Sequence, residues 1–172
     1  MSFQDNKNTN EDTIALVKKF SESNTRKRRN LINDIESSAE SLYELGEEII
    51  KNFDKEGDDW SSGWILQVLK KYKPKFFDNK IYNNWFAVKS DASIDYSILQ
   101  ENLLDQKFEE ADRLTSAYLR KLAGKVAENR GYVFYSEVKN MPGEDLVTID
   151  RLWNIYSQGK FGFSNQAKLL KS

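Results

Sequence analysis

The apolar residues of this chain recur at intervals of three and four over most of its length, and this spacing is what most constrains its fold. An α-helix turns once in about 3.6 residues, so the spacing places these side chains on one face of a helix. Residues 108–122 show it most clearly. The positions on that face are Phe108, Ala111, Leu114, Thr115, Tyr118, Leu119 and Leu122. No long stretch alternates apolar and polar residues, so we predict an all-α fold.

The first ninety residues predict a helical bundle. Residues 1–10 are rich in Asn, Asp and Lys and lack periodicity, so we expect a disordered lead there. A short helix is predicted to end at Phe20, and a longer helix follows a polar break. The apolar stripe of the longer helix comprises Leu31, Ile35, Leu42, Leu45, Ile49 and Phe53. A further helix over 60–73 ends before Pro74, because proline lacks an amide donor.

The second half of the chain predicts another helical domain. Residues 75–91 hold aromatic side chains without a clean period and are interpreted as a packed connector. Asp95 and Asp145 are each expected to cap a helix, and Gly124 to end one. Residues 131–138 could form a strand, but we favour a loop leading into a helical turn. The predicted division is a disordered lead at 1–10, an N-terminal helical bundle with its connector at 11–90, and a helical domain at 91–172.

The chain contains neither Cys nor His, and this excludes whole classes of chemistry. Zinc sites built on Cys or His, Ser-His-Asp catalysis and haem iron held by His are ruled out. No two acids can be argued from the sequence to face one cleft, and Asp145, Asp150 and Arg151 are interpreted as an ion pair or a cap. We therefore predict no catalytic residue and no metal site. The lack of Cys indicates a reducing compartment.

Charge and hydropathy argue against two kinds of partner. The net charge is -1, and the basic run at residues 26–29 is flanked by acids and has no interleaved aromatic residue, so we expect no nucleic-acid binding. No apolar run approaches the roughly 20 residues of a membrane span, so we expect at most peripheral membrane contact. The first twenty residues include Asp5, Glu11 and Asp12, a composition that fits neither a secretory signal nor a transit peptide.

The most distinctive string of the chain lies between Leu146 and Gln166. It contains Ile-Asp-Arg-Leu-Trp, a Tyr-Ser pair and Gly-Lys-Phe-Gly-Phe-Ser in close order. This string resembles the signature of the Genomes-Uncoupled-Four porphyrin-binding family. The segment from Asp95 to Leu122, with its Asp-Tyr-x-x-Leu and Phe-Glu-Glu-Ala-Asp elements, is similar to the opening helices of that family. Together these segments cover about the last 80 residues.

The resemblance implies a non-catalytic protein of chlorophyll biosynthesis. Its members bind protoporphyrin IX or Mg-protoporphyrin IX as a ligand, without a covalent cofactor, and stimulate the large porphyrin-binding subunit of magnesium chelatase. We accordingly expect a monomer in the cytoplasm of a cyanobacterium or in the plastid stroma. Family domains usually continue well past the Phe-Gly-Phe-Ser element, so the chain is either a natural short form or a fragment, and part of the porphyrin site is then absent. The alternative is a helical-repeat adaptor that binds a protein partner without a small ligand.

A porphyrin is a flat apolar disc with two anionic propionates, so its site needs apolar walls and cations at the rim. Phe161 and Phe163 are the candidate walls, although they could equally fill the core after a helix-stopping turn. The candidate rim cations are Lys160, Lys125 and Arg130, each of which could otherwise be an ordinary surface charge. Leu114, Tyr118 and Leu122 share a helical stripe that is either core or the floor of the cleft.

Overall fold

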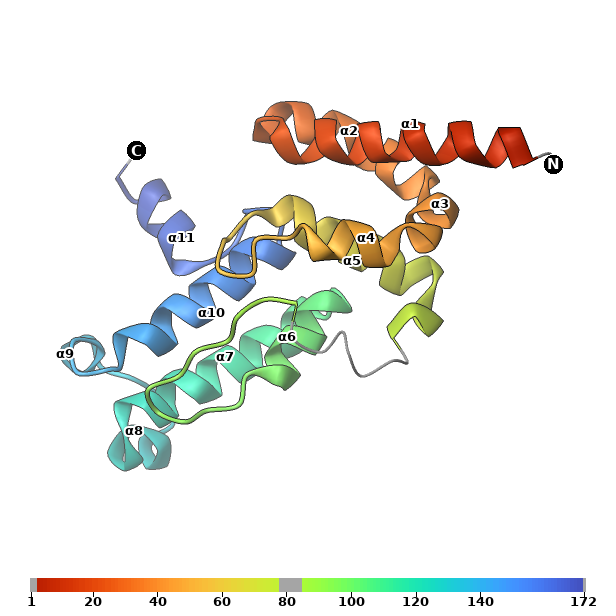
Figure 1. The fold of residues 1–172 in the computed structure, drawn as a ribbon. Coiled ribbons are helices and arrows are strands. Elements are labelled where there is room, and N and C mark those ends of the chain that lie inside the picture. Colours follow the sequence, from red (N-terminus) through yellow and green to blue (C-terminus); the bar gives the residue numbers. More distant parts are fainter. Residues whose placement is uncertain (1–2, 78–84, 172) are drawn as a thin grey trace. The chain divides into compact units, whose positions relative to one another are not determined.

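The computed structural model describes residues 3–77 and 85–171, and every regular element in those ranges is helical (Figure 1). The predicted all-α class is therefore confirmed. The chain divides into two compact units, Met1–Phe86 and Ala87–Ser172. The division falls just before the region in which the sequence places its boundary. None of the described helices is long and apolar enough to cross a membrane.

The described part of the N-terminal unit contains five α-helices and a 3₁₀ turn. They are α1 (Phe3–Glu22), α2 (Thr25–Ser37), α3 (Ala39–Glu44), α4 (Gly46–Lys51), α5 (Trp60–Tyr72) and η1 (Pro74–Phe77). Helix α1 begins at Phe3, within the segment that we expected to be disordered. Residues 4–12 contain neither Pro nor Gly, so a helix anchored by the buried Phe20 can extend through them once its nucleus has formed.

The long helix expected after the polar break is three helices instead. The first interruption is at Ser38, whose hydroxyl donates to the Asp34 carbonyl at 2.9 Å, a bond typical of a bent helix. The second is at Leu45, and the next residue, Gly46, packs against Phe76 so closely that a Cβ there would lie 2.5 Å from the ring Cε2. Glycine is thus the residue that lets the chain turn against this ring. The expected stripe still faces inward, since Ile35, Leu42 and Ile49 are buried.

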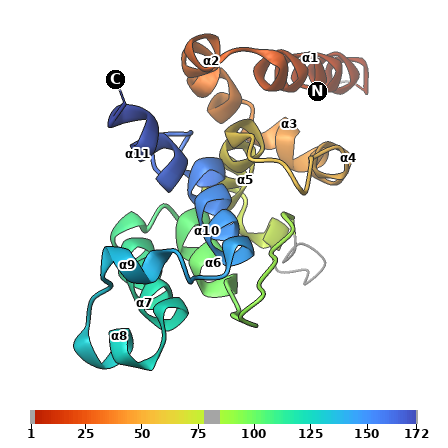
Figure 2. The ribbon, with the colours of Figure 1, turned by 90° about the vertical axis from the view of Figure 1, so that its left-hand side faces the viewer.

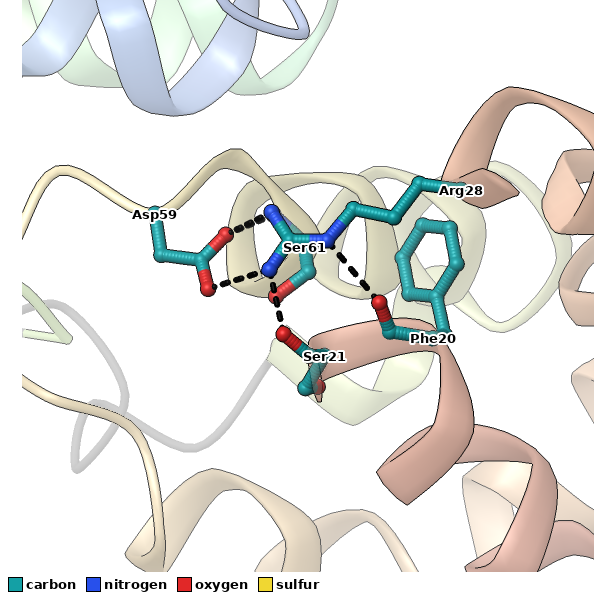
Figure 3. Close-up of polar contacts among 5 residues, drawn as sticks. All are labelled: Phe20, Ser21, Arg28, Asp59 and Ser61. Carbon is teal, nitrogen blue, oxygen red and sulfur yellow. Dashed lines mark hydrogen bonds and ion pairs between the residues drawn. The ribbon is translucent and has the colours of Figure 1, made fainter. Parts of the chain in front are cut away.

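One side chain, Arg28, connects three parts of the N-terminal unit (Figure 3). Its Nη1 and Nη2 donate to the Asp59 carboxylate at 2.5 and 2.9 Å, its Nε donates to the Phe20 carbonyl at 2.9 Å, and Nη2 also donates to the Ser21 carbonyl. The guanidinium also lies 5.4 Å from the centre of the Trp60 ring. The end of α1 and the start of α5 are thereby held by a residue of the basic run, so Arg28 has a structural role.

We expect Arg28→Lys to destabilise the N-terminal unit by about 1–3 kcal/mol, because a lysine cannot reproduce the fork that binds Asp59 and two carbonyls together. Urea unfolding of the full chain measures the loss. Arg29→Lys is the matched control, since Arg29 is exposed and the change should cost little. Equal stability of the two variants would show that the Arg28 contacts contribute nothing.

The C-terminal unit contains six helices. They are α6 (Ser97–Leu104), α7 (Phe108–Ala123), α8 (Lys125–Arg130), α9 (Tyr135–Val138), α10 (Gly143–Tyr156) and α11 (Phe163–Leu169). The helical turn predicted within 131–138 is confirmed as α9. Helix α10 packs against α6 (Figure 2). Its inward face is formed by Ile149, Leu152 and Ile155, which are almost fully buried.

Of the two aspartates predicted to cap helices, only Asp95 supplies a hydrogen-bond acceptor at the start of one. Asp95 stands one residue before the N-cap, and its carboxylate accepts from the Ser97 amide at 2.9 Å, so it supplies the predicted acceptor. Asp145 is not a cap, because α10 already begins at Gly143. Its fully buried carboxylate instead accepts from the Asp91 and Ala92 amides at 2.9 and 3.2 Å, from the Tyr96 hydroxyl at 2.8 Å, and from the Ser90 hydroxyl.

Helix α10 also forms hydrogen bonds with the first residues of the C-terminal unit at two further points. The Thr148 hydroxyl donates to the Lys89 carbonyl at 2.8 Å, and the Arg151 guanidinium donates to the Ala87 carbonyl at 3.1 Å. Residues 87–92 form no regular element, so side chains of α10 supply hydrogen bonds that a helix or sheet would otherwise make. Asp145 and Arg151 of α10 therefore have structural roles rather than forming an acid/base cluster.

Candidate functional site

The C-terminal unit has a surface cavity of about 330 Å³ between α7, the end of α10 and the start of α11. Its size falls in the usual range for a small-ligand site. The lining residues are Phe108, Glu109, Asp112, Thr115, Trp153, Phe161, Gly162, Phe163 and Gln166.

Four aromatic side chains line this cavity, and three of them form a cluster of rings. The Phe108 ring lies 6.1 Å from the Trp153 ring in a near-parallel arrangement, and the Phe161 ring meets both at 6.0 Å edge to face. The Trp153 indole is fixed by a 2.9 Å hydrogen bond from its Nε1 to the Thr115 hydroxyl. Phe161 is 46% exposed, whereas Trp153 is 8% exposed. Trp153 is therefore the buried and fixed member of the cluster, and Phe161 is its accessible member.

The turn that carries Phe161 and Phe163 is held by side chains on both sides. The Phe161 amide donates to the Ser157 hydroxyl at 2.9 Å, and the Asn165 side-chain amide donates to the Gly159 and Phe161 carbonyls at 2.9 and 3.2 Å. The Ser164 amide, in the first turn of α11, donates to the Asp150 carboxylate at 3.0 Å. These bonds fix the backbone of the turn from which both phenylalanines project.

Gly162 is required at the centre of this turn. Its φ is +121°, a conformation that side-chain-bearing residues rarely adopt. A Cβ at this position would lie 2.6 Å from Asp150 Oδ1 and 3.3 Å from the Asp150 carbonyl oxygen. The glycine thus allows the turn to pass directly over α10, which places the following helix beside the cavity.

The charges that line the cavity are acidic. Glu109 and Asp112 project from α7, and both are exposed. None of the three predicted rim cations lines the cavity, although the exposed Lys160 immediately precedes Phe161. In the part of the chain that the structure describes, no group of three or more acids is placed to hold a metal ion. The cavity therefore combines aromatic walls with an acidic side on α7.

Two of the predicted rim cations lie on α8. Lys125 is its first residue and is exposed. Arg130 is its last, and its guanidinium donates to the Glu137 carboxylate at 2.6 Å and lies 4.0 Å from the centre of the Phe134 ring. The Phe134 amide also donates to Glu137, and these bonds hold the pKa of Glu137 below its usual value. Arg130 thereby fastens the loop between α8 and α9.

The predicted floor residues do not line the cavity. Leu114, Tyr118 and Leu122 are half-buried on α7. The Tyr118 ring packs edge to face on Tyr96 at 5.0 Å, its hydroxyl donates to the Asp95 carbonyl at 3.2 Å, and burial raises its pKa. Of the predicted site residues, the structure brings Phe161 and Phe163 together at the cavity.

The sequence reading missed the residues that complete the aromatic cluster. Phe108 and Thr115 belong to the apolar stripe of α7, with Thr115 two helical turns after Phe108 and two turns before Leu122. Trp153 lies in the distinctive string itself. Periodicity identified their faces, but it could not show that the turn at 157–163 would fold back onto them.

A comparison with known families decides the identity of this unit. The family model described as GUN4-like, the abbreviation of Genomes-Uncoupled-Four, matches residues 89–172. The C-terminal unit belongs to the GUN4 family. The matched range contains every residue of the aromatic cavity.

Relatives of this chain include proteins of Synechocystis and Arabidopsis thaliana. The Ycf53-like protein of Synechocystis is 36% identical over 125 residues, covering 70% of this chain and 54% of that protein. The chloroplastic tetrapyrrole-binding protein of Arabidopsis thaliana is 45% identical over 74 residues, covering 43% of this chain and 28% of that protein. The chain therefore spans about half or less of the relatives it matches.

Among solved structures, GUN4 from Chlamydomonas reinhardtii is similar to this chain. The two share 41% sequence identity with a TM-score of 0.48, and the match covers 49% of this chain and 60% of the other.

Proposed function

We propose that the GUN4 unit binds a tetrapyrrole, protoporphyrin IX or Mg-protoporphyrin IX, at the aromatic cavity. The observation that carries this proposal is the Phe108, Trp153 and Phe161 cluster, which surrounds an open cavity inside the family-matched segment. Aromatic rings contribute about 0.5–1.5 kcal/mol to stacking beyond the area that they bury. The relative in Arabidopsis thaliana, named for tetrapyrrole binding, supports the same ligand class.

The cavity dictates how the ligand would lie. A porphyrin disc is larger than a space of about 330 Å³, so one edge of the ring enters it while the rest stays outside. The propionates point away from Asp112, because like charges repel, whereas Glu109 is already ion-paired with Arg113. Lys160, on the same turn as Phe161, is the cation that we propose for one propionate. Lys125 and Arg130 are not assigned a contact.

The partner and the setting follow from the family. We propose that the protein delivers its tetrapyrrole to the large porphyrin-binding subunit of magnesium chelatase and stimulates that enzyme, without catalysing a reaction itself. Relatives in a cyanobacterium and in a chloroplast support an origin in the cyanobacterial cytoplasm or the plastid stroma. The chemistry of the cavity fits a carrier, since apolar rings dominate it.

Replacing Phe163 by Leu tests the proposed site. We expect protoporphyrin IX to bind severalfold more weakly while the thermal midpoint changes little, because Phe163 is only half-buried beside the cavity. Fluorescence titration and thermal denaturation measure the two effects. Phe134→Leu is the matched control, since Phe134 is 49% exposed and lies outside the cavity. A large loss of stability with unchanged affinity would mean that Phe163 is core and that the site is elsewhere.

A further inference from the structure

The N-terminal unit has a cavity of its own, of about 420 Å³, between α1, α4 and the start of α5. It lies outside the family-matched residues, and nothing in the proposed function uses it. Its lining residues are Ile14, Val17, Lys18, Ser21, Glu48, Ile49, Asn52, Phe53, Asp54, Asp59, Ser61 and Ser62.

The cavity has one apolar side and one polar end. The apolar lining consists of Ile14 and Val17 of α1, Ile49 of α4, and Phe53. The Phe53 ring stacks on the Phe86 ring at 6.4 Å, and this contact holds the apolar wall in place. Such walls suit a small hydrocarbon body.

The polar end is built on the Arg28 cluster (Figure 3). The Asp59 carboxylate there accepts from Arg28 and, at 2.9 Å, from the Ser61 amide. The Ser61 hydroxyl is buried and forms no hydrogen bond within the described part of the chain. A buried hydroxyl without a partner is costly, so this end of the cavity retains an unused polar group beside a fixed carboxylate.

The charges around the cavity select the kind of head group. Asp59 is paired with Arg28, and the largely exposed Lys18 adds one positive charge to the lining. Glu48 and Asp54 add two negative charges to the lining. The mouth is therefore net negative, which favours a cationic group and disfavours an anionic one.

We propose that this cavity is a binding site for a small amphiphile with a hydrocarbon body and an ammonium head. The body packs against Val17, Ile49 and Phe53. The ammonium head lies toward Glu48 and Asp54, because Asp59 is already paired with Arg28. The net negative mouth also separates this site from the tetrapyrrole cavity, since a dianionic porphyrin would be repelled here.

A pair of probes of equal chain length tests the proposal. Amide signals of the isotopically labelled full chain are followed by NMR during titration with n-octylammonium and, separately, with n-octanoate. We expect octylammonium to shift residues of α1, α4 and 52–54 saturably and to bind at least about threefold more tightly than octanoate. Equal affinity for the two probes, no saturation, or shifts confined to the C-terminal unit would each overturn it.

Charge reversal provides a second test that does not depend on filling the cavity. Glu48→Lys should weaken octylammonium binding about threefold or more and strengthen octanoate binding. Glu44→Lys is the matched control, because Glu44 is also exposed but does not line this cavity. Both positions lie on the surface, so both variants should fold. An identical response of the two variants would show that the head group does not lie at Glu48.

Discussion

Replacement of Asp145 by Asn should destabilise the C-terminal unit by about 2–4 kcal/mol, a large effect for one isosteric change. The buried carboxylate accepts four hydrogen bonds from residues 90–96. An asparagine keeps one acceptor oxygen and turns an amide toward the remaining donors. Urea unfolding of the full chain, followed through amide signals of α10, measures the loss.

Asp91→Asn is the control for this change. Asp91 lies in the same segment, but its side chain is exposed, so the same substitution should cost less than about 0.5 kcal/mol. If the Asp145 and Asp91 variants unfold at the same denaturant concentration, the anchoring role of Asp145 is wrong.

The same carboxylate sets a pH dependence. Burial alone would raise the pKa of Asp145, but its hydrogen bonds from Ser90, Tyr96 and the two amides outweigh burial and lower it below the usual 3.8. The stabilisation is therefore complete above the pKa of the unfolded chain and is lost as the pH falls through the lower folded value. At pH values under about 4, we expect the free energy of unfolding of the wild-type chain to decrease as the pH is lowered. The Asp145→Asn variant should show a shallower decrease over the same range.

Gly162→Ala should abolish most tetrapyrrole binding and also reduce stability by about 1–3 kcal/mol. A methyl group at φ +121° is strained and would lie 2.6 Å from Asp150 Oδ1. The turn must then move, which breaks the bond from the Ser164 amide to Asp150 and displaces Phe161 and Phe163 from the cavity. Affinity for protoporphyrin IX should fall at least about tenfold, because several ligand contacts are lost together.

Gly143→Ala controls for the change of residue type. Gly143 is in the first turn of α10, and a Cβ there meets nothing within 4 Å. This variant should bind the porphyrin like wild type and have equal or greater stability, since alanine favours helix. Normal affinity in the Gly162 variant would place the ligand away from this turn.

The helical class and the inward faces could be predicted from the sequence, because a spacing of three and four is a local property. The turns within the stripe of Ile35, Leu42 and Ile49 could not. They depend on contacts between distant residues, such as Gly46 against Phe76. Asp145 shows the same limit. Its position before an apolar run suggested a cap, whereas its four hydrogen-bond donors come from a segment more than 45 residues earlier.

The candidate site was predictable to a similar degree. The distinctive string drew attention to Phe161 and Phe163, and the structure adds Phe108 and Trp153 as their partners at the cavity. That partnership is a tertiary contact, and the sequence offers no local signal for it. The charge of the cavity lining could not be predicted from the sequence either. Glu109 and Asp112 look like ordinary surface acids in the sequence, and only the structure places α7 beside the turn.

The most direct test of tetrapyrrole binding is an absorbance titration of protoporphyrin IX with the wild-type chain, followed at the intense near-ultraviolet band of the porphyrin. We expect the band to shift saturably to a single site per chain, and Phe161→Ala to reduce the affinity several-fold. A helical adaptor without a small ligand would give no saturable shift at any protein concentration. That result would contradict the proposed function.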